Sequence, residues 1–251
     1  MSAVGQAGLL ARRNLLRMGR NPASLVGAVV TPAVFFLSFY LVMRKVLEAQ
    51  GIDYEQYLPP AIVVQAMIFV AMTSAYFTAD DRAAGVSDRL RAMPVRAGAV
   101  LAARLLADAG RAALCLVVVV GLGVAVGFRF TAGPLAAAGF VAVALGFAVA
   151  LALAFGTVAH TARNPEAAVQ GLALPYIVLF MLSTAFVPAE RFPGWLEPVV
   201  RDQPVSQVIA TLRALASGGP TTGPLLSSTL WTLGLAVPFA ALTLRTTGRA
   251  R

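Results

Sequence analysis

Residues 134–159 read PLAAAGFVAVALGFAVALALAFGTVA, a run without a single charged side chain. A helix that crosses a lipid bilayer needs about 20 largely apolar residues, so this run predicts a transmembrane helix. Other stretches meet the same criterion or come close to it, and they lie at 25–43, 58–79, 104–128, 167–187 and 224–244. The second of these begins near Pro59-Pro60, which is typical of a helix start. The predicted fold class is therefore an all-α integral membrane protein with six transmembrane helices.

The composition of the whole chain supports a membrane location. Of the 251 residues, 59% are hydrophobic and 12% are charged, and the mean hydropathy is +0.79. Soluble domains carry about 25% charged residues, so this chain has too few to cover a water-facing surface. The apolar content excludes a disordered chain, and the single Cys115 excludes a secreted domain built on disulfides.

The net charge of +9 would by itself suggest binding to nucleic acid. The whole excess, however, falls on the side of the six predicted spans that carries both termini, and the other side is neutral. Membrane proteins concentrate Lys and Arg on the cytoplasmic side, so both termini are predicted to be cytoplasmic. The charge then reflects topology and attraction to anionic lipid, and no nucleic-acid partner is expected. Because arginine and alanine are abundant and lysine is rare, we expect a GC-rich bacterial source and a location in the bacterial plasma membrane.

Residues 4–20, ahead of the first span, have the pattern of an amphipathic helix. Its apolar face contains Val4, Ala7, Ala11, Leu15 and Met18, and the opposite face contains Arg13, Arg17 and Arg20. Such a helix lies in the headgroup plane with its arginines in water or on phosphates. Two interpretations stay open: a simple cytoplasmic anchor, or an interface helix that also contacts a cytoplasmic partner.

The loop between the second and third spans contains the most informative segment, residues 80–96, which read DDRAAGVSDRLRAMPVR. Val86, Leu90 and Met93 follow one another at i, i+4 and i+7, and Pro94 ends the pattern. This spacing predicts a short helix over 81–93, with one apolar ridge between charges of both signs. A helix of this kind is suited to docking in a groove of another protein. The alternative is a solvated loop.

Charged residues also occur where the third span begins. Arg104, Asp108 and Arg111 have spacings that allow ion pairs along one helix face. We interpret them as residues that keep this helix soluble beyond the bilayer, and a proton relay is the alternative. All acids are expected to lie outside the uncharged cores of the spans. Carriers driven by protons or sodium need acids inside the membrane, so the sequence argues against that class.

Neutral polar residues do occur inside the predicted spans. Gln65, Gln170 and Tyr176 are the candidates for a substrate path between two copies of the protein. The alternative is that they hydrogen-bond neighbouring helices without touching substrate.

Catalysis within this chain is not expected. The sole histidine, His160, has no serine in a Gly-x-Ser-x-Gly context with which to form a triad. A lone His with the lone Cys115 does not make a metal site. The only lysine, Lys45, follows Arg44, so the Gly-Lys-Ser/Thr of a phosphate-binding loop is missing. We therefore expect neither an enzyme nor a bound cofactor.

Two blocks of sequence carry a resemblance to a known family. The first consists of Asp81, Gly85, Arg89-Leu90 and Pro94-Val95-Arg96, and the second runs from Ser183 to Leu196 and continues with Gln203-Pro204, Leu212-Arg213-Ala214-Leu215 and Gly218. In their order along the chain they resemble the membrane subunits of ABC-2 type transporters, especially the daunorubicin-resistance permease group. Departures occur at Asp81, Val86, Thr184-Ala185 and Gln203, where the family commonly has Glu, Thr, Ser-Gly and Asn.

The resemblance implies a transmembrane subunit of an ATP-binding cassette exporter for a hydrophobic or amphipathic substrate, such as a drug, an antibiotic or a lipid. Two copies of a separate ATPase subunit would hold ATP and Mg²⁺, and a second permease, most simply an identical one, would complete the path. The alternative is an ion-gradient-driven secondary carrier or a membrane component that does not transport.

The resemblance also implies roles for particular segments. It makes 4–20 an interface helix, 81–93 the coupling helix and 188–218 a re-entrant hairpin on the outer face. The residues implied to couple to the ATPase are Asp81, Arg82, Gly85, Val86, Arg89, Leu90 and Met93.

Overall fold

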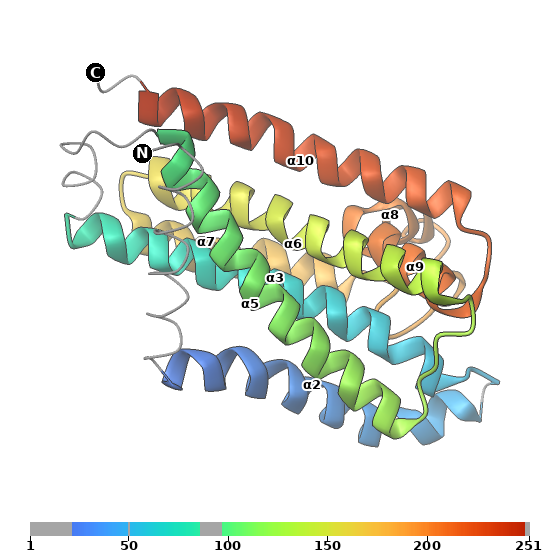
Figure 1. Ribbon diagram of the computed structural model, residues 1–251. Helices are drawn as coiled ribbons and strands as arrows, with labels where there is room; N and C mark the ends of the chain where they lie inside the picture. The colour runs from blue at the N-terminus through green and yellow to red at the C-terminus, as the bar shows by residue number, and fades with distance from the viewer. Residues whose placement is uncertain (1–21, 50, 86–96, 249–251) are drawn as a thin grey trace.

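The computed structural model describes residues 22–49, 51–85 and 97–248, and every regular element in these residues is helical. The long helices are α2 (Pro22–Glu48), α3 (Tyr54–Ala83), α5 (Ala97–Val126), α6 (Pro134–Thr161) and α10 (Thr222–Gly248). The shorter ones are α7 (Pro165–Met181), η1 (Ala189–Arg191), α8 (Glu197–Asp202) and α9 (Pro204–Ser217), as Figure 1 shows.

Among the described residues, five helices are long and apolar enough to cross a membrane: α2, α3, α5, α6 and α10. The protein is therefore a multi-pass membrane protein. The predicted span 167–187 falls on α7, which has 17 residues and ends at Met181. A helix of that length is about 25 Å long, short of the roughly 30 Å of the hydrocarbon core. Six crossings therefore stay a prediction.

The helices alternate in direction, so the connections gather at two ends of the bundle (Figure 1). One end, named here the Arg82 end, contains the end of α3, the start of α5, the α6–α7 connection and the end of α10. The other, named the Arg213 end, contains the α2–α3 and α5–α6 connections together with α8 and α9.

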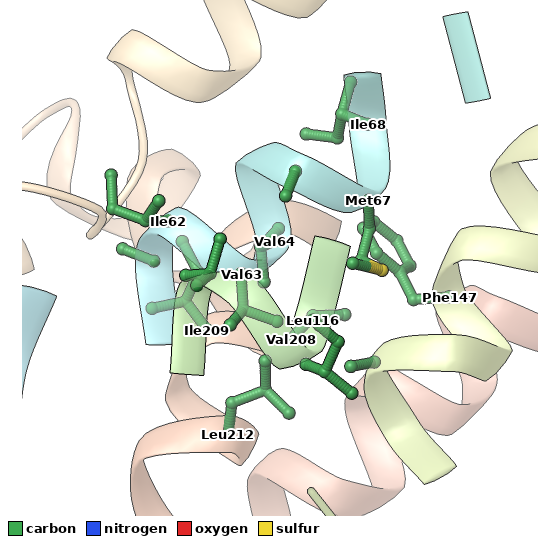
Figure 2. Packing of buried hydrophobic residues seen from close by; sticks show 14 of the residues in the cluster. Ile62, Val63, Val64, Met67, Ile68, Leu116, Phe147, Val208, Ile209 and Leu212 are labelled. Atoms are coloured by element: carbon green, nitrogen blue, oxygen red, sulfur yellow. The ribbon is translucent and has the colours of Figure 1, made fainter. Parts of the chain in front are cut away.

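Helix α3 lies in the centre of the bundle and supplies more buried apolar residues than any other described helix. Its buried residues Ile62, Val63 and Met67 contribute to an apolar cluster with α5, α6 and α9. Figure 2 shows this cluster, in which Leu116, Phe147, Val208, Ile209 and Leu212 come from the three other helices. Helix α10, by contrast, exposes most of its apolar residues. The core thus positions α3 against α2, α5, α6, α7 and α9, and α10 packs on the outside.

The start of α3 differs from the sequence prediction. Pro59 and Pro60 lie inside the helix, which begins at Tyr54. Asp53 caps this start, because its side chain accepts a hydrogen bond from the backbone N–H of Gln56 (3.3 Å). The prolines remove two intrahelical hydrogen bonds, but the capped and buried first turn holds the helix in place before them.

The segment 188–218 contains η1, α8 and α9. Helix α9 covers the apolar-periodic stretch 204–217 and ends at Gly218, which has a φ of 80°. Glycine adopts this left-handed conformation without steric cost. The re-entrant placement of this segment relative to a membrane stays a prediction.

Two predicted segments fall wholly or partly outside the described residues. The interface helix 4–20 is one, and the part of the coupling helix from residue 86 onward is the other.

Candidate functional site

Arg82 joins the last turn of α3 to the connection between α6 and α7. Its Nη1 donates hydrogen bonds to the carbonyl oxygens of His160 (2.8 Å) and Ala162 (2.6 Å). His160 lies in the last turn of α6, and Ala162 is the residue that follows the helix. Carbonyls at a helix C-terminus have no partner within the helix and carry partial negative charge. The Arg82 guanidinium therefore caps α6.

A cavity of about 290 Å³ lies beside this contact. It is lined by Ala79, Arg82, Ala83, Arg163, Asn164, Pro165 and Glu166. Asn164 shapes its wall because its side chain accepts a hydrogen bond from the N–H of Ala167 (3.2 Å) and so caps the start of α7. The cavity thus lies in the corner between the end of α3 and the start of α7.

The residues predicted to couple to an ATPase are only partly described. Asp81 and Arg82 belong to the last turn of α3 and are half-buried. Gly85 follows the helix with a φ of 67°, a conformation that favours glycine, so the chain turns away from the α3 axis there. Val86, Arg89, Leu90 and Met93 lie outside the described residues.

A buried polar cluster, formed by Ser74, Arg104, Asp108 and Arg111, joins α3 to α5. The Oγ of Ser74 donates to Asp108 Oδ2 (2.6 Å) and accepts from Arg104 Nη2 (3.0 Å). Arg111 Nη1 donates to Asp108 Oδ1 (2.9 Å). One carboxylate thus lies between two guanidinium groups, and Ser74 extends the network to the neighbouring helix.

The burial of this cluster corrects the sequence interpretation. Asp108 is 3% exposed and Arg111 6%, so these residues do not make the helix soluble by facing water. Asp108 also lies within a candidate span, Gly98–Val126, ahead of the uncharged core of the predicted third span, which begins at Ala112. The i,i+3 spacing of Asp108 and Arg111 is the same for a solvated pair and a buried one. Whether the pair is solvated or buried depends on the helices that pack against it.

A glycine of α6 makes room for this cluster. A β-carbon at Gly156 would lie 2.7 Å from Arg104 Cζ, so the guanidinium packs directly against the α6 backbone. On the other side, Arg104 Nη2 also donates to the Ser74 carbonyl (3.2 Å). Arg104 therefore lies between α3 and α6. Nothing in the local pattern around Gly156 indicates this contact.

Two of the three predicted path residues lie together. Gln65 Nε2 donates to the Tyr176 hydroxyl (3.3 Å) and joins α3 to α7. Phe69 packs beside this pair, with its ring centroid 5.6 Å from that of Tyr176. Gln170 is not part of the contact and lies exposed on α7. The pairing fits the interhelical alternative for Gln65 and Tyr176, and it leaves a role in a substrate path untested.

Arg213 holds the Arg213 end together, a role that the sequence interpretation missed. Its guanidinium donates to the carbonyls of Tyr57 (3.0 Å), Thr184 (2.9 Å) and Ala185 (3.1 Å). It also lies over the Tyr57 ring, 3.4 Å from the centroid. Helix α9, the first turn of α3 and the loop after α7 are thereby fixed to one another. The one indication of this role in the sequence was a single arginine within the apolar-periodic stretch 204–217.

Burial lowers the pKa of the Arg213 guanidinium below its ordinary value, to about 10. Arg213 therefore stays a cation at neutral pH. A buried cation is stable only when its donors are satisfied, and the three carbonyls and the Tyr57 ring supply that environment. Two further hydrogen bonds hold the loop after α7. Gln203 Nε2 donates to the Leu182 carbonyl, and the Thr184 N–H donates to Ser206 Oγ (3.1 Å).

The described residues offer no metal or nucleophilic centre. Within 22–49, 51–85 and 97–248, no group of three His, Cys, Asp or Glu side chains lies close enough to hold a metal ion. Cys115 is buried in the apolar cluster.

Comparison with known proteins identifies the family. The model of the ABC-2 type transporter family matches residues 5–216. The chain is 33% identical over 239 residues to the probable doxorubicin resistance ABC transporter permease protein DrrC of Mycobacterium tuberculosis, covering 93% of this chain and 85% of that protein. It is 29% identical over 235 residues to the daunorubicin resistance ABC transporter permease protein DrrB1 of Streptomyces coeruleorubidus, covering 93% and 82% of the two chains. The protein therefore belongs to the family of ABC-2 type transporters.

Proposed function

We propose that this chain is the membrane subunit of an ABC exporter that moves hydrophobic or amphipathic compounds out of the cell. The observation that carries the proposal is the family match over residues 5–216, together with relatives whose names are those of drug-resistance permeases. The chain lacks the Gly-Lys-Ser/Thr of a phosphate-binding loop. ATP and Mg²⁺ are therefore bound by a separate subunit, present in two copies.

Coupling to the ATPase is assigned to the 81–93 segment. In this proposal the ridge of Val86, Leu90 and Met93 sits in a groove of the ATPase, and closure of the ATPase pair on ATP displaces α3 and α5. Asp81 and Arg89 would add ionic contacts with the same partner. The end of α3 at Ala83 and the turn at Gly85 support this arrangement, because they place the start of the segment at the Arg82 end of the bundle.

A second copy of the chain is proposed to complete the substrate path. Helix α7 exposes an apolar stripe that includes Leu174, Ile177 and Met181, and Gln170 lies on the same face at helical spacing. Lipid can cover the apolar residues but cannot satisfy a glutamine side chain. This supports a homodimer contact along α7, with Gln170 near the path and the Gln65–Tyr176 pair behind it.

The proposed topology places the Arg82 end in the cytoplasm. Six crossings result if α7 and the following loop 182–188 together traverse the membrane. Both termini are then cytoplasmic, in agreement with the concentration of arginine at that side.

The test is reconstitution of the full chain with its ATP-binding subunit in proteoliposomes. We expect ATP-dependent transport of doxorubicin, the compound in the names of the relatives. Replacement of Val86, Leu90 and Met93 by Asp should abolish co-purification of the ATPase and transport. Leu135→Asp, an exposed residue at the other end of the bundle, serves as the matched control. Unchanged assembly and coupling in the triple variant would rule out this docking site.

An ion-gradient-driven carrier is the second candidate, and the buried Asp108 is the observation that favours it. In such a carrier, transport would continue without ATP and would stop when the gradient is collapsed. The position of Asp108 between two arginines favours a structural ion pair instead. Transport assays with ATP alone and with an ion gradient alone separate the two functions.

A further inference from the structure

The contact between Arg82 and α6 has a mechanical consequence. One nitrogen of Arg82 binds two carbonyls that lie on either side of the α6 terminus. Two residues after Ala162 the chain reaches Asn164, which caps α7. The last turn of α3 is therefore attached to the corner formed by residues 160–164, at which α6 ends and α7 begins, and both helices extend from there toward the Arg213 end.

We infer that Arg82 is a positioning residue that transmits displacement of the coupling helix to the corner between α6 and α7. This inference rests on the proposed function, and it gives Arg82 a different role from the ATPase contact that the sequence suggests. Arg82 lies at the boundary between α3 and the coupling segment. Movement of that segment shifts the Arg82 backbone first, and the two hydrogen bonds carry the shift to α6 and α7.

The neighbouring arginine provides a matched control. Arg163 lines the same cavity and is exposed, whereas Arg82 is half-buried and donates to the two carbonyls. Replacing either arginine by Met keeps an unbranched, flexible side chain and removes one positive charge at the same end of the bundle. A difference between Arg82→Met and Arg163→Met is therefore due to the lost hydrogen bonds of Arg82 and not to the lost charge.

The experiment uses the full permease with its ATPase in lipid nanodiscs. Spin labels at Ala84→Cys and Ala167→Cys, both exposed positions, report the distance between the end of α3 and the start of α7 in a Cys115→Ala background. With Arg82 present, we expect a narrow distribution of the distance within each protomer, with and without trapped ATP. In Arg82→Met we expect a broadened distribution and transport reduced roughly tenfold, within the usual range of coupling between sites. Arg163→Met should leave both quantities unchanged.

Arg82→Lys keeps the inference testable if Arg82→Met does not fold. Lysine presents one nitrogen with three donors, so it can reach both carbonyls and should keep the narrow distribution and most of the transport. A broad distribution combined with full transport, in either variant, would overturn the inference. So would an Arg82→Met protein that behaves like Arg163→Met.

Failure of this inference can be told apart from failure of the proposed function. We expect ATPase co-purification to stay normal in Arg82→Met and to be lost in the triple Asp variant of Val86, Leu90 and Met93. If Arg82→Met has no effect while the triple variant loses the ATPase, only the role of Arg82 is refuted. If the triple variant assembles and transports normally, the coupling helix itself is refuted.

Discussion

Asp108→Asn should destabilise the protein by an amount that follows from the two ion pairs of Asp108. The pair with Arg111 is 2.9 Å long, and its side chains are only 4% and 7% exposed. Removing one member of such a buried pair costs about 3–5 kcal/mol. The pair with Arg104 is 4.0 Å long and that arginine is 28% exposed, so it contributes little. Because Asn retains an acceptor oxygen, we expect the lower limit, about 3 kcal/mol.

The assay is thermal unfolding of the purified chain in detergent, followed by tryptophan fluorescence. For a chain of this size about 3 kcal/mol corresponds to a midpoint lowered by roughly 6–12 °C. Asp202→Asn is the matched control, because Asp202 is 69% exposed and its pair with Arg201 is 3.7 Å long. That variant should change the free energy of unfolding by about 0–1 kcal/mol.

Two results bear on the reasoning for Asp108. An Asp108→Asn midpoint equal to that of Asp202→Asn would refute the claim that the buried cluster stabilises the contact between α3 and α5. In the other direction, the double variant Asp108→Leu, Arg111→Met should be more stable than Asp108→Asn alone. It removes the unpaired buried cation together with its partner.

Three further predictions follow from single contacts. Arg213→Lys should lower the free energy of unfolding by about 2–3 kcal/mol, because lysine cannot donate to three carbonyls and stack on a ring at once. The control Arg191→Lys, at an exposed position, should change the free energy of unfolding by less than about 0.5 kcal/mol in the same thermal assay. Gly156→Ala should displace the Arg104 guanidinium and lower stability by about 2 kcal/mol, and a midpoint like that of the parent protein would contradict the packing inferred there. Tyr176→Phe should cost only about 0.6 kcal/mol yet raise the apparent KM for doxorubicin transport several-fold, and an unchanged KM would exclude Tyr176 from the substrate path.

The apolar helices could be predicted from sequence because an uncharged run long enough to cross a bilayer has few other stable conformations. The run 134–159 corresponds closely to α6, Pro134–Thr161. Helix ends were harder to predict, since they depend on caps and loops. Asp53 starts α3 ahead of the prolines, and α7 ends at Met181 where Ser183 Oγ donates to the Phe180 carbonyl (2.6 Å).

The polar contacts could not be predicted because their partners come from distant parts of the chain. Spacing alone indicated that Asp108 and Arg111 can pair. It could not reveal that Ser74 of α3 and Gly156 of α6 enclose the same cluster. Arg213 was likewise identified from the sequence only as part of the block Leu212-Arg213-Ala214-Leu215, whereas its partners are backbone carbonyls of α3 and of the loop after α7.

The contacts of Tyr57 and Arg82 lie at opposite ends of one helix. Helix α3 has 30 residues and is therefore about 45 Å long. Near one end the Tyr57 carbonyl accepts a hydrogen bond from Arg213. Near the other end Arg82 donates hydrogen bonds to two carbonyls at the corner between α6 and α7. An axial shift of α3 by even a fraction of a helical turn must therefore alter contacts at both ends of the bundle at once. Hydrogen exchange at the two ends should accordingly rise and fall together, even though no side chain spans the distance between them.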